Sequence, residues 1–591
     1  MNHIIRKHLL LSLFSLVVWN NPAFAQAPAG GCGDGVCDEF EKGRRDLCPQ
    51  DCAAEKATEP SDGETFVKEE KIPAARANLS IDYSKNLGAF SPYLFGIQGL
   101  RLSASDPNVR ESGFRLITTH APAFSPLSVN GYDSDKLDDM DADIKEIIKI
   151  KAIPMLYFYQ IVNPIRSDGD AQRYSSSVRA IARHLRDRWP AQKFVLFFGN
   201  EPDWEIMRCA DEPSVPTDFW DGSRQDFFKA YAIWAKAAKS VDPDFIVGGA
   251  GVAIPIVPMN LRDRDCKINA DFTGVPGEVS RWVTDFLDYA QSNKVPVDFF
   301  SFHAYSKLLR VRFYDEVGKL AKKFKEYPSL SPLFGAPLLA TNEWNMMLTD
   351  DVGVRNLCFH GQWDDDCVRQ LESFKTAYKS AHNIAALINM IDQGLQLNTV
   401  YAALYQNVPA SSTDETKLDI EGNCRFFTFI CANEARNIYY AFKGFNWLAD
   451  TSRLAVSGAD RANFSAIAGK SKADKGIVAV LANYDYNSYR GNYPVTNNLK
   501  AHEDAEYSEY KKNYGRPKVY DKYILTLNNL PWSPSDKVIY ERYIVDDNKK
   551  LELVETQTVA GNSSLTFTRD IAAPSVEVVK VYKNESGDKR R

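Results

Sequence analysis

The segment FVLFFGNEPDW, residues 194–204, joins an unbroken apolar run to a polar turn. An unbroken apolar run of this length is typical of a strand whose two faces are both covered, as in a parallel sheet. The run ends at Gly199, and Asn200, Glu201 and Pro202 follow it. A carboxylate placed where a strand stops is held by a rigid element and opens onto the space beyond it. Because the residue before a proline favours extended backbone, we expect Glu201 to be extended.

Seven further runs in the same part of the chain have a similar texture, and helical patterns such as residues 171–189 and 277–292 separate most of them. Eight strand–helix units within residues 78–448 predict an α/β fold, a (β/α)8 TIM barrel. A doubly wound open sheet is the alternative, but no glycine-rich phosphate loop follows the first strand. The other seven runs are LFGIQGLRL (94–102), FRLITTH (114–120), IPMLYFYQ (153–160), FIVGGAGV (245–252), VDFFSFHAY (297–305), PLLATNEW (337–344) and VYAALYQ (400–406).

The helical texture stops near residue 448. Residues 449–583 contain a series of short alternating segments, among them KYILTLNNL (522–530) and SVEVVKVYK (575–583), which predict an all-β sandwich domain. The segment NLSIDYS (78–84), ahead of the barrel, could add a strand to it. We expect the tail, residues 584–591, to be disordered.

The chain begins with features of an export signal. Arg6 and Lys7 precede the short apolar run LLLSLFSLVVW, and AFAQ supplies a small-residue cleavage pattern, which predicts a signal peptide over residues 1–25. An uncleaved anchor is the alternative, but the run is short for a membrane span. We therefore expect a protein exported to the periplasm or the extracellular space, with no membrane contact after cleavage.

Residues 26–53 form a cysteine-rich module, and residues 54–77 form an acidic linker. The module resembles small CGDGxC modules of secreted bacterial proteins. Its four cysteines allow three disulfide connectivities, and its acidic residues could hold a structural calcium ion or simply form a solvated loop. These residues are Cys32, Cys37, Cys48 and Cys52, and Asp34, Asp38, Glu41 and Asp51.

Six more cysteines follow, and an oxidising compartment would allow them to form disulfides. The plausible pairs by sequence proximity are Cys358 with Cys367, Cys424 with Cys431, and Cys209 with Cys266. No histidines accompany them at metal-ligand spacing, which argues against a zinc site.

Two glutamates mark a candidate active site. Glu201 follows the fourth predicted strand, and Glu343 in TNEWN ends the seventh. The active site of a parallel barrel lies at the carboxyl ends of its strands, so both carboxylates are expected on the same rim. A carboxylate pair across a cleft is what cleavage of a glycosidic bond requires, one group acting as acid and the other as nucleophile or base.

These motifs resemble those of the large clan of retaining (β/α)8 glycoside hydrolases. The resemblance implies that Glu201 is the acid/base and Glu343 the nucleophile, and that Asn200 contacts the 2-hydroxyl of the sugar. SFHAYS is similar to the strand-six element of the clan and maps to His303 and Tyr305. Arg115 in FRLI resembles an arginine that lies near the nucleophile. The plainer alternatives are a hydrogen-bonded core histidine at His303 and an ion pair at Arg115.

Within the clan the chain is most similar to glycoside hydrolase family 39, which includes β-xylosidases and α-L-iduronidases. The resemblance spans roughly residues 80–583 and includes NIYYAFKGFNWL (437–448) and VIYERYIVDDNKKL (538–551). It implies a retaining mechanism with carboxyl groups about 5 Å apart and no cofactor for catalysis. Trp204 and Trp344, which follow the catalytic candidates, could stack on sugar rings or serve as packing residues.

We expect the partner to be a polysaccharide or oligosaccharide. The net charge is −6 on 591 residues, and no basic stripe of the kind that binds nucleic acid dominates the sequence. A catalytically silent carbohydrate-binding protein is the first alternative, although binding alone would not need both glutamates. A polysaccharide lyase is the second, but the predicted rim lacks the cationic cluster that suits uronic acids.

Overall fold

The structure, a computed structural model, describes residues 74–99, 104–122, 135–158, 167–203, 222–257, 277–306, 317–346, 376–406, 434–461, 463–471, 475–484 and 518–584, with a few short pieces between them. The predicted signal peptide, cysteine-rich module with its calcium candidates, linker and tail lie outside the described residues, and so does Trp204. Every predicted cysteine pair also has at least one member outside them.

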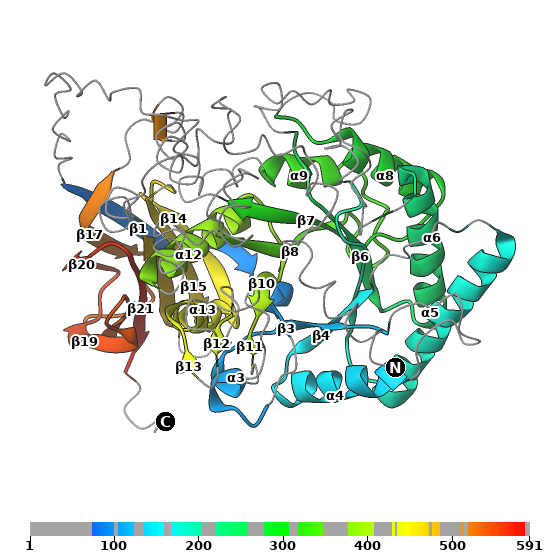
Figure 1. Cartoon of the computed structure of the whole chain (residues 1–591). Helices are drawn as coiled ribbons and strands as arrows, with labels where there is room; N and C mark the ends of the chain where they lie inside the picture. The colour runs from blue at the N-terminus through cyan, green and yellow to red at the C-terminus, as the bar shows by residue number, and fades with distance from the viewer. Residues whose placement is uncertain are drawn as a thin grey trace, which may run out of the picture. The chain divides into compact units, whose positions relative to one another are not determined.

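A parallel sheet forms the first part of the described chain (Figure 1). Its strand order is β10-β2-β3-β4-β5-β6-β7-β8-β9, and each of the eight runs predicted from the sequence overlaps one of its strands. The strands are β2 (Gly96–Gln98), β3 (Leu116–His120), β4 (Ile153–Phe158), β5 (Val195–Phe198), β6 (Ile246–Val252), β7 (Phe299–Ser306), β8 (Leu338–Met346), β9 (Leu397–Asn398) and β10 (Val400–Ala403).

One segment closes this sheet into a barrel. β9 pairs with β8, and β10, which begins two residues later, pairs with β2 at the opposite end of the strand order. Residues 397–403, which include the start of the eighth predicted run, therefore bridge β8 and β2. The predicted (β/α)8 barrel is confirmed.

The apolar run of β5 is buried on both sides. Phe197 points into the barrel, where its ring centroid lies 4.4 Å from that of Tyr157. Phe198 points outward, with ring centroids 5.4 Å from both Phe227 and Trp234. Both aromatic neighbours belong to one covering helix, so the unbroken apolar run reflects two apolar environments.

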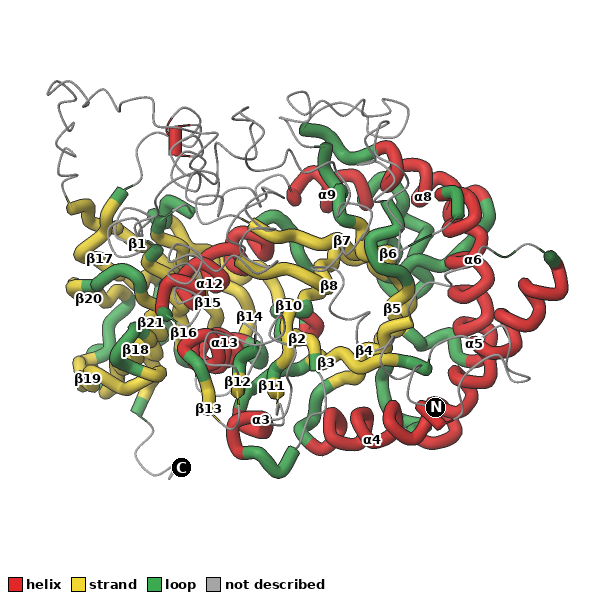
Figure 2. The backbone as a smooth tube through the Cα atoms, viewed as in Figure 1, coloured by secondary structure: helices red, strands yellow, loops and turns green. Residues whose placement is uncertain are grey.

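Helices lie outside the strands (Figure 2). α6 begins with a capping box in which Ser223 and Asp226 exchange side-chain and backbone hydrogen bonds, and Ser167 and Ser280 cap two others. The helices are α3 (Pro107–Glu111), α4 (Asp135–Lys149), α5 (Asp168–Arg188), α6 (Arg224–Val241), α8 (Arg281–Ser292), α9 (Val317–Phe324), α12 (Ala377–Asp392) and α13 (Asn437–Phe445). Among the helices that the structure describes, none combines the length and apolar character needed to cross a bilayer.

A nine-stranded all-β sheet forms the second part, with the order β19-β18-β21-β16-β15-β14-β1-β17-β20. β1, which precedes the barrel in the chain and contains NLSIDYS, lies between β14 and β17. The strands are β1 (Ala74–Ala89), β14 (Thr451–Ser457), β15 (Phe464–Ser471), β16 (Ile477–Asn483), β17 (Val519–Asn528), β18 (Lys537–Val545), β19 (Lys550–Ala560), β20 (Ser564–Asp570) and β21 (Ser575–Lys583).

This sheet curls so that its two ends face each other. The rings of Tyr540 on β18 and Phe567 on β20 stack with their centroids 4.2 Å apart. Arg569 on β20 donates to Glu555 on β19, joining the two terminal strands of the order. The predicted C-terminal all-β domain is confirmed, as one continuous sheet folded around its own apolar core.

α12 and α13 connect the two parts. α12 contacts β8 of the barrel and also β15, β16 and β21 of the all-β sheet, and α13 packs against β18, β19 and β21. Every residue of α12 from Ala377 to Ile391 is buried, which is expected of a helix covered on all sides. A small third sheet combines β11 (Tyr405–Gln406), β12 (Ile430–Cys431) and β13 (Glu434–Ala435).

Candidate active site

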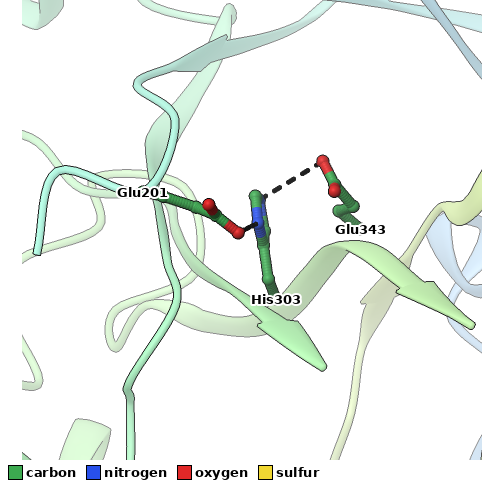
Figure 3. A group of neighbouring side chains, drawn as sticks. All are labelled: Glu201, His303 and Glu343. Atoms are coloured by element: carbon green, nitrogen blue, oxygen red, sulfur yellow. Dashed lines mark hydrogen bonds and ion pairs between the residues drawn. The ribbon is translucent and has the colours of Figure 1, made fainter. Parts of the chain in front are cut away.

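Glu201 and Glu343 lie on either side of His303 at the carboxyl ends of the barrel strands (Figure 3). Glu201 follows β5, Glu343 lies in the second half of β8, and His303 belongs to β7. All three side chains are buried, with 4 to 5% of each residue exposed. The barrel thus brings together two residues that are far apart in the sequence, as the spacing of the motifs predicts.

A bulge in β8 directs Glu343 into the barrel. Phe302 on β7 is opposite Thr341, whereas the next residue, His303, is opposite Glu343, so Asn342 is an extra residue on β8. A single extra residue reverses the inward and outward alternation of a strand beyond it. Glu343 therefore faces inward after Asn342, and Trp344 faces outward.

The backbone at Glu201 differs from the expectation. Its φ is +45°, in the left-handed region, so the extended conformation expected from Pro202 is wrong. The amide of Glu201 donates to the carbonyl oxygen of Gly251 at 2.8 Å, which ties the residue to the end of β6. Such a conformation costs about 1–3 kcal/mol and persists only where surrounding contacts hold it.

Asp203 supplies the other contacts that hold this turn. Its carboxylate accepts the backbone amides of Ala253 and Ile254, each at 2.8 Å, and the residue is fully buried. Burial raises the pKa of Asp203 to about 6, against the lowering effect of these two amides, and the charge of Glu201 adds to the increase. The turn 201–203 is therefore joined by these three hydrogen bonds to the end of β6 and to the two residues that follow it.

The two carboxylates are close enough to act on one bond. His303 Nδ1 lies 2.7 Å from Glu201 Oε1, and His303 Nε2 lies 3.9 Å from Glu343 Oε2. One carboxylate oxygen of Glu201 and one of Glu343 lie within 4.8 Å of each other. This upper limit agrees with the carboxyl separation of about 5 Å typical of retaining glycosidases and is shorter than the roughly 6.5–9.5 Å of inverting ones.

The same cluster offers donor atoms of the kinds that bind metals. However, the 2.7 Å separation of His303 Nδ1 and Glu201 Oε1 is that of a hydrogen bond. Two ligands of one ion at about 2.1 Å and right angles would be about 3 Å apart. We therefore interpret the cluster as a hydrogen-bonded group.

Tyr305 orients the second carboxylate. Its hydroxyl donates to Glu343 Oε1, which leaves the other oxygen of Glu343 toward His303. Burial and the negative charge of Glu343 raise the pKa of Tyr305 well above its ordinary value, so the phenol stays a donor. For His303, burial acts to lower the pKa, but the charges of Glu343 and Glu201 outweigh it and the pKa is raised.

Asn200 is buried beside this group. Its Oδ1 accepts a hydrogen bond from the hydroxyl of Tyr157 at 2.8 Å, and 8% of the residue is exposed. Tyr157 lies in β4, so the amide is held by the neighbouring strand. Sequence reasoning did not identify Tyr157, although a hydroxyl within an apolar run at a strand end was available as a signal.

The structure places Arg115 away from this cluster. Arg115 immediately precedes β3, at the amino end of the strands, roughly 15 Å along the strand from the rim. Its guanidinium is 2.7 Å from the carboxylate of Asp450, whose side chain is 84% exposed. The expected position near Glu343 is therefore wrong, because β3 begins only after Arg115.

Trp344 is also in a different environment from the one expected of a sugar platform. It is fully buried, its indole N–H donates to Asn398, and its ring packs against Phe442 of α13. The bulge at Asn342 explains this position, since it turns Trp344 to the outer face of β8. The alternative of a packing role is the one that the structure supports.

Four further residues at the rim escaped sequence reasoning. Asn342 and Ser301 form a buried hydrogen bond beneath His303, and Asp203 anchors the Glu201 turn. His120 ends β3 opposite Tyr157, and burial lowers its pKa to about 4, so its imidazole is neutral. Asn342 could have been singled out from the sequence, because it is a polar residue within a strand whose other residues predict burial.

Comparison with known proteins adds to this geometry. Residues 152–317 match the family model described as Glycosyl hydrolases family 39. The family 39 match includes Glu201, His303 and Tyr305 and ends before Glu343.

Two curated relatives overlap parts of the chain, and both are named beta-xylosidase. The one from Geobacillus stearothermophilus is 35% identical over 138 residues, which cover 23% of this chain and 21% of the relative. The one from Caldicellulosiruptor saccharolyticus is 23% identical over 239 residues, which cover 37% of this chain and 41% of the relative. The chain thus matches less than half the length of either relative.

A solved structure of a glucosidase from Croceicoccus marinus has the same fold over most of the chain. The TM-score is 0.58 at 20% sequence identity, and the match covers 86% of this chain and 99% of the other. A match of this length includes both the barrel and the all-β sheet.

Proposed function

We propose that this protein is a retaining glycoside hydrolase in which Glu343 is the nucleophile and Glu201 the acid/base. The observation that carries the proposal is the pair of buried carboxylates at the ends of β5 and β8, with oxygens within 4.8 Å of each other. The family 39 match over residues 152–317 supports it. We expect catalysis to need no cofactor.

In the first step, a Glu343 oxygen attacks the anomeric carbon. The bond from that carbon to the leaving oxygen breaks, the electron pair remains on this oxygen, and Glu201 supplies its proton. The product is a glycosyl ester of Glu343. In the second step, Glu201 takes a proton from water, the water oxygen attacks the anomeric carbon, and the Glu343 carboxylate is released.

Neighbouring side chains favour this division of roles. The hydrogen bond from Tyr305 fixes one oxygen of Glu343, so the other is available for attack. Glu201 has a backbone position fixed by Gly251 and a hydrogen bond to His303, and together they fix its carboxyl group relative to Glu343. Asn200, immediately before it, is the candidate for contact with the 2-hydroxyl of the sugar.

For the substrate we propose β-xylosides first, because both curated relatives are named beta-xylosidase. Glucosides and uronic-acid glycosides are the next classes to examine. Export to the periplasm or beyond, the cysteine pairs and a calcium ion in the module at residues 26–53 remain predictions from the sequence.

The test is hydrolysis of β-xylosides by purified protein, followed by proton NMR from the earliest time points. We expect the first sugar released to have the same anomeric configuration as the substrate. Glu343→Gln should lose this activity by about a thousandfold or more. Release of the opposite anomer would overturn the retaining mechanism.

Glu201→Gln provides the matched comparison. The loss of activity should be large for substrates with a poor leaving group and much smaller for aryl glycosides whose leaving group needs no protonation. If Glu343→Gln remained active, the nucleophile would be another residue. If no glycoside were cleaved but sugars still bound, the silent carbohydrate-binding function would replace this proposal.

A further inference from the structure

A layer of buried polar side chains lies beneath the two glutamates, and Asn342 is at its centre. Ser301 Oγ donates to Asn342 Oδ1, Asn342 Nδ2 donates toward the hydroxyl of Tyr157 at 3.5 Å, and Nδ2 lies 3.3 Å from His303 Nε2. Asn342 and Ser301 are fully buried. The layer joins three strands, β4, β7 and β8.

The backbone of Asn342 fixes the position of its side chain. Its carbonyl oxygen accepts hydrogen bonds from the side-chain amide of Gln98 at 2.9 Å and from the hydroxyl of Thr399 at 2.9 Å, so the bulge is held from β2 and from the segment that closes the barrel. A Cβ on Gly251 would lie 2.9 Å from His303 Nε2 and 3.4 Å from Asn342 Oδ1. The ring and the amide are therefore packed in one arrangement.

This arrangement determines which nitrogen of His303 carries hydrogen. An N–H of Asn342 directed at Nε2 requires a lone pair there, so the hydrogen of a neutral ring lies on Nδ1. Nδ1 then donates to Glu201 Oε1 at 2.7 Å. A neutral ring of this tautomer satisfies both contacts.

The surrounding carboxylates, in contrast, favour a protonated His303 ring. Glu201 and Asp203 from the turn after β5, and Glu343 from β8, all attract a second proton onto His303. Tyr157 from β4 and Tyr305 from β7 direct their hydroxyls at partners other than His303. His120 of β3 lies beside the Tyr157 ring, and Tyr401 of β10 lies beside the Tyr305 ring. An imidazolium between the two glutamates would favour the ionised form of both, and an ionised Glu201 has no proton to give to a leaving group.

We propose that Asn342 is a positioning residue that keeps His303 neutral, with its hydrogen on Nδ1, so that Glu201 holds the proton used in catalysis. The three carboxylates favour a proton on Nε2, whereas the amide N–H of Asn342 requires a lone pair on that nitrogen. This role rests on the proposed function, since it concerns the acid step, but the protonation of His303 can be measured without any substrate.

The experiment is two-bond proton–nitrogen NMR of the full chain labelled with 15N-histidine, with the His303 signals assigned by comparison with His303→Gln. At pH 7 we expect the wild type to show the neutral tautomer with hydrogen on Nδ1. Asn342→Asp replaces the N–H with a carboxylate oxygen and should convert His303 to imidazolium at the same pH. A wild-type ring that is already imidazolium, or that carries hydrogen on Nε2, would overturn the proposal.

Ser301→Ala is a second variant in case Asn342→Asp does not fold. It introduces no new charge into the site. It removes the donor that fixes Asn342 Oδ1 and lets the amide turn, so the proportion of imidazolium should rise in the same direction by a smaller amount. An unchanged His303 in both variants would contradict the proposal.

Asn398→Asp is the matched control, since Asn398 is equally buried and its amide contacts Trp344 and Leu94 instead of His303. This variant should lower the stability of the protein and leave the protonation state of His303 unchanged. In activity assays, Asn342→Asp should lose roughly 100-fold in kcat/KM for poor leaving groups and far less for activated ones. If no variant of the chain, wild type included, cleaved glycosides while the NMR result held, the proposed function would fail and the assignment of His303 would stand.

Discussion

Trp344 shows how one inserted residue changes the environment of a side chain. It follows the candidate nucleophile directly, yet it lies on the opposite face of β8, where it packs against Phe442 and bonds Asn398. Although Trp344 is adjacent to the candidate nucleophile, it therefore supports the strand by packing. Its effect on activity should be indirect.

Trp344→Phe tests this conclusion. The substitution removes buried volume and the indole hydrogen bond to Asn398, so the free energy of unfolding should fall by about 1–3 kcal/mol. Urea unfolding measures this loss, and KM for the cleaved glycoside should change by less than about twofold. A large rise in KM with unchanged stability would show that Trp344 contacts the sugar.

Gly251 is a position that only glycine can occupy. Its φ is +64°, and an added Cβ would meet His303 at 2.9 Å and Phe197 at 3.0 Å. Both the backbone conformation and the lack of space require glycine here. The close approach lets the end of β6 accept the amide of Glu201 and pack against the imidazole.

The turn after β5 and the end of β6 act as one structural element. Glu201 has a left-handed backbone, and the contacts that hold it come from Gly251, Ala253 and Ile254. Asp203 makes two of these contacts while bearing a carboxylate in a buried position. The element therefore places Glu201 at a cost in stability.

Asp203→Asn should weaken this connection. One acceptor oxygen becomes an NH₂ group that faces a backbone N–H, which costs about 1–3 kcal/mol and lets Glu201 relax. We expect kcat to fall roughly tenfold or more, with a smaller change in KM, in steady-state assays at a temperature where the variant is folded.

Asp298→Asn serves as the control for that experiment. Asp298 is also fully buried and accepts a backbone amide, that of Val247 at 2.9 Å, but it precedes β7 at the other end of the barrel. Asp298 also pairs with Lys239 at 2.7 Å, so this variant should lose at least as much stability as Asp203→Asn, yet keep kcat near the wild-type value. Equal losses of kcat in the two variants would assign Asp203 a general structural role only.

The two parts of the molecule are joined through the chain as well as by packing. β1 enters the all-β sheet before the barrel begins, and α12 contacts both parts. Within the all-β sheet, Glu577 is 1% exposed and accepts hydrogen bonds from Tyr523 at 2.9 Å and Arg542 at 3.1 Å. Burial raises the pKa of Glu577 to about 7, although Arg542 and Tyr523 act to lower it.

This pKa predicts a pH dependence of stability for the whole molecule. Because the folded pKa exceeds the ordinary value of 4.5, the folded state binds the proton more tightly, and stability declines as pH rises from about 4.5 to 7. Relative to Glu577→Gln, the wild type should lose unfolding free energy across this window and change little above pH 8. Urea unfolding at several pH values measures the difference.

The outcome also tests how the two parts are coupled. Because β1 and α12 link them, loss of activity in the barrel and loss of the all-β structure should occur at the same urea concentration at each pH. A difference between wild type and Glu577→Gln that did not depend on pH would contradict the assignment of Glu577. Two separate transitions would show that the parts unfold independently.

The sequence by itself determined the barrel, the all-β domain and the glutamate pair. Apolar runs such as FVLFF report burial on both faces of a strand, and Glu201 and Glu343 each follow such a run, so parallel packing brings them to one rim. These features depend on patterns within a few residues of each position. Periodicity along a strand or helix is a local property and can be read from the chain.

The tertiary structure decided which side chains surround that pair. The bulge at Asn342, the left-handed backbone at Glu201 and the position of Arg115 before β3 depend on strand register and on contacts with distant segments. Asn342 and Tyr157 are 185 residues apart in the chain yet share one buried polar layer. A one-residue shift in register reverses the direction of every later side chain in a strand, and only the packed barrel fixes that register.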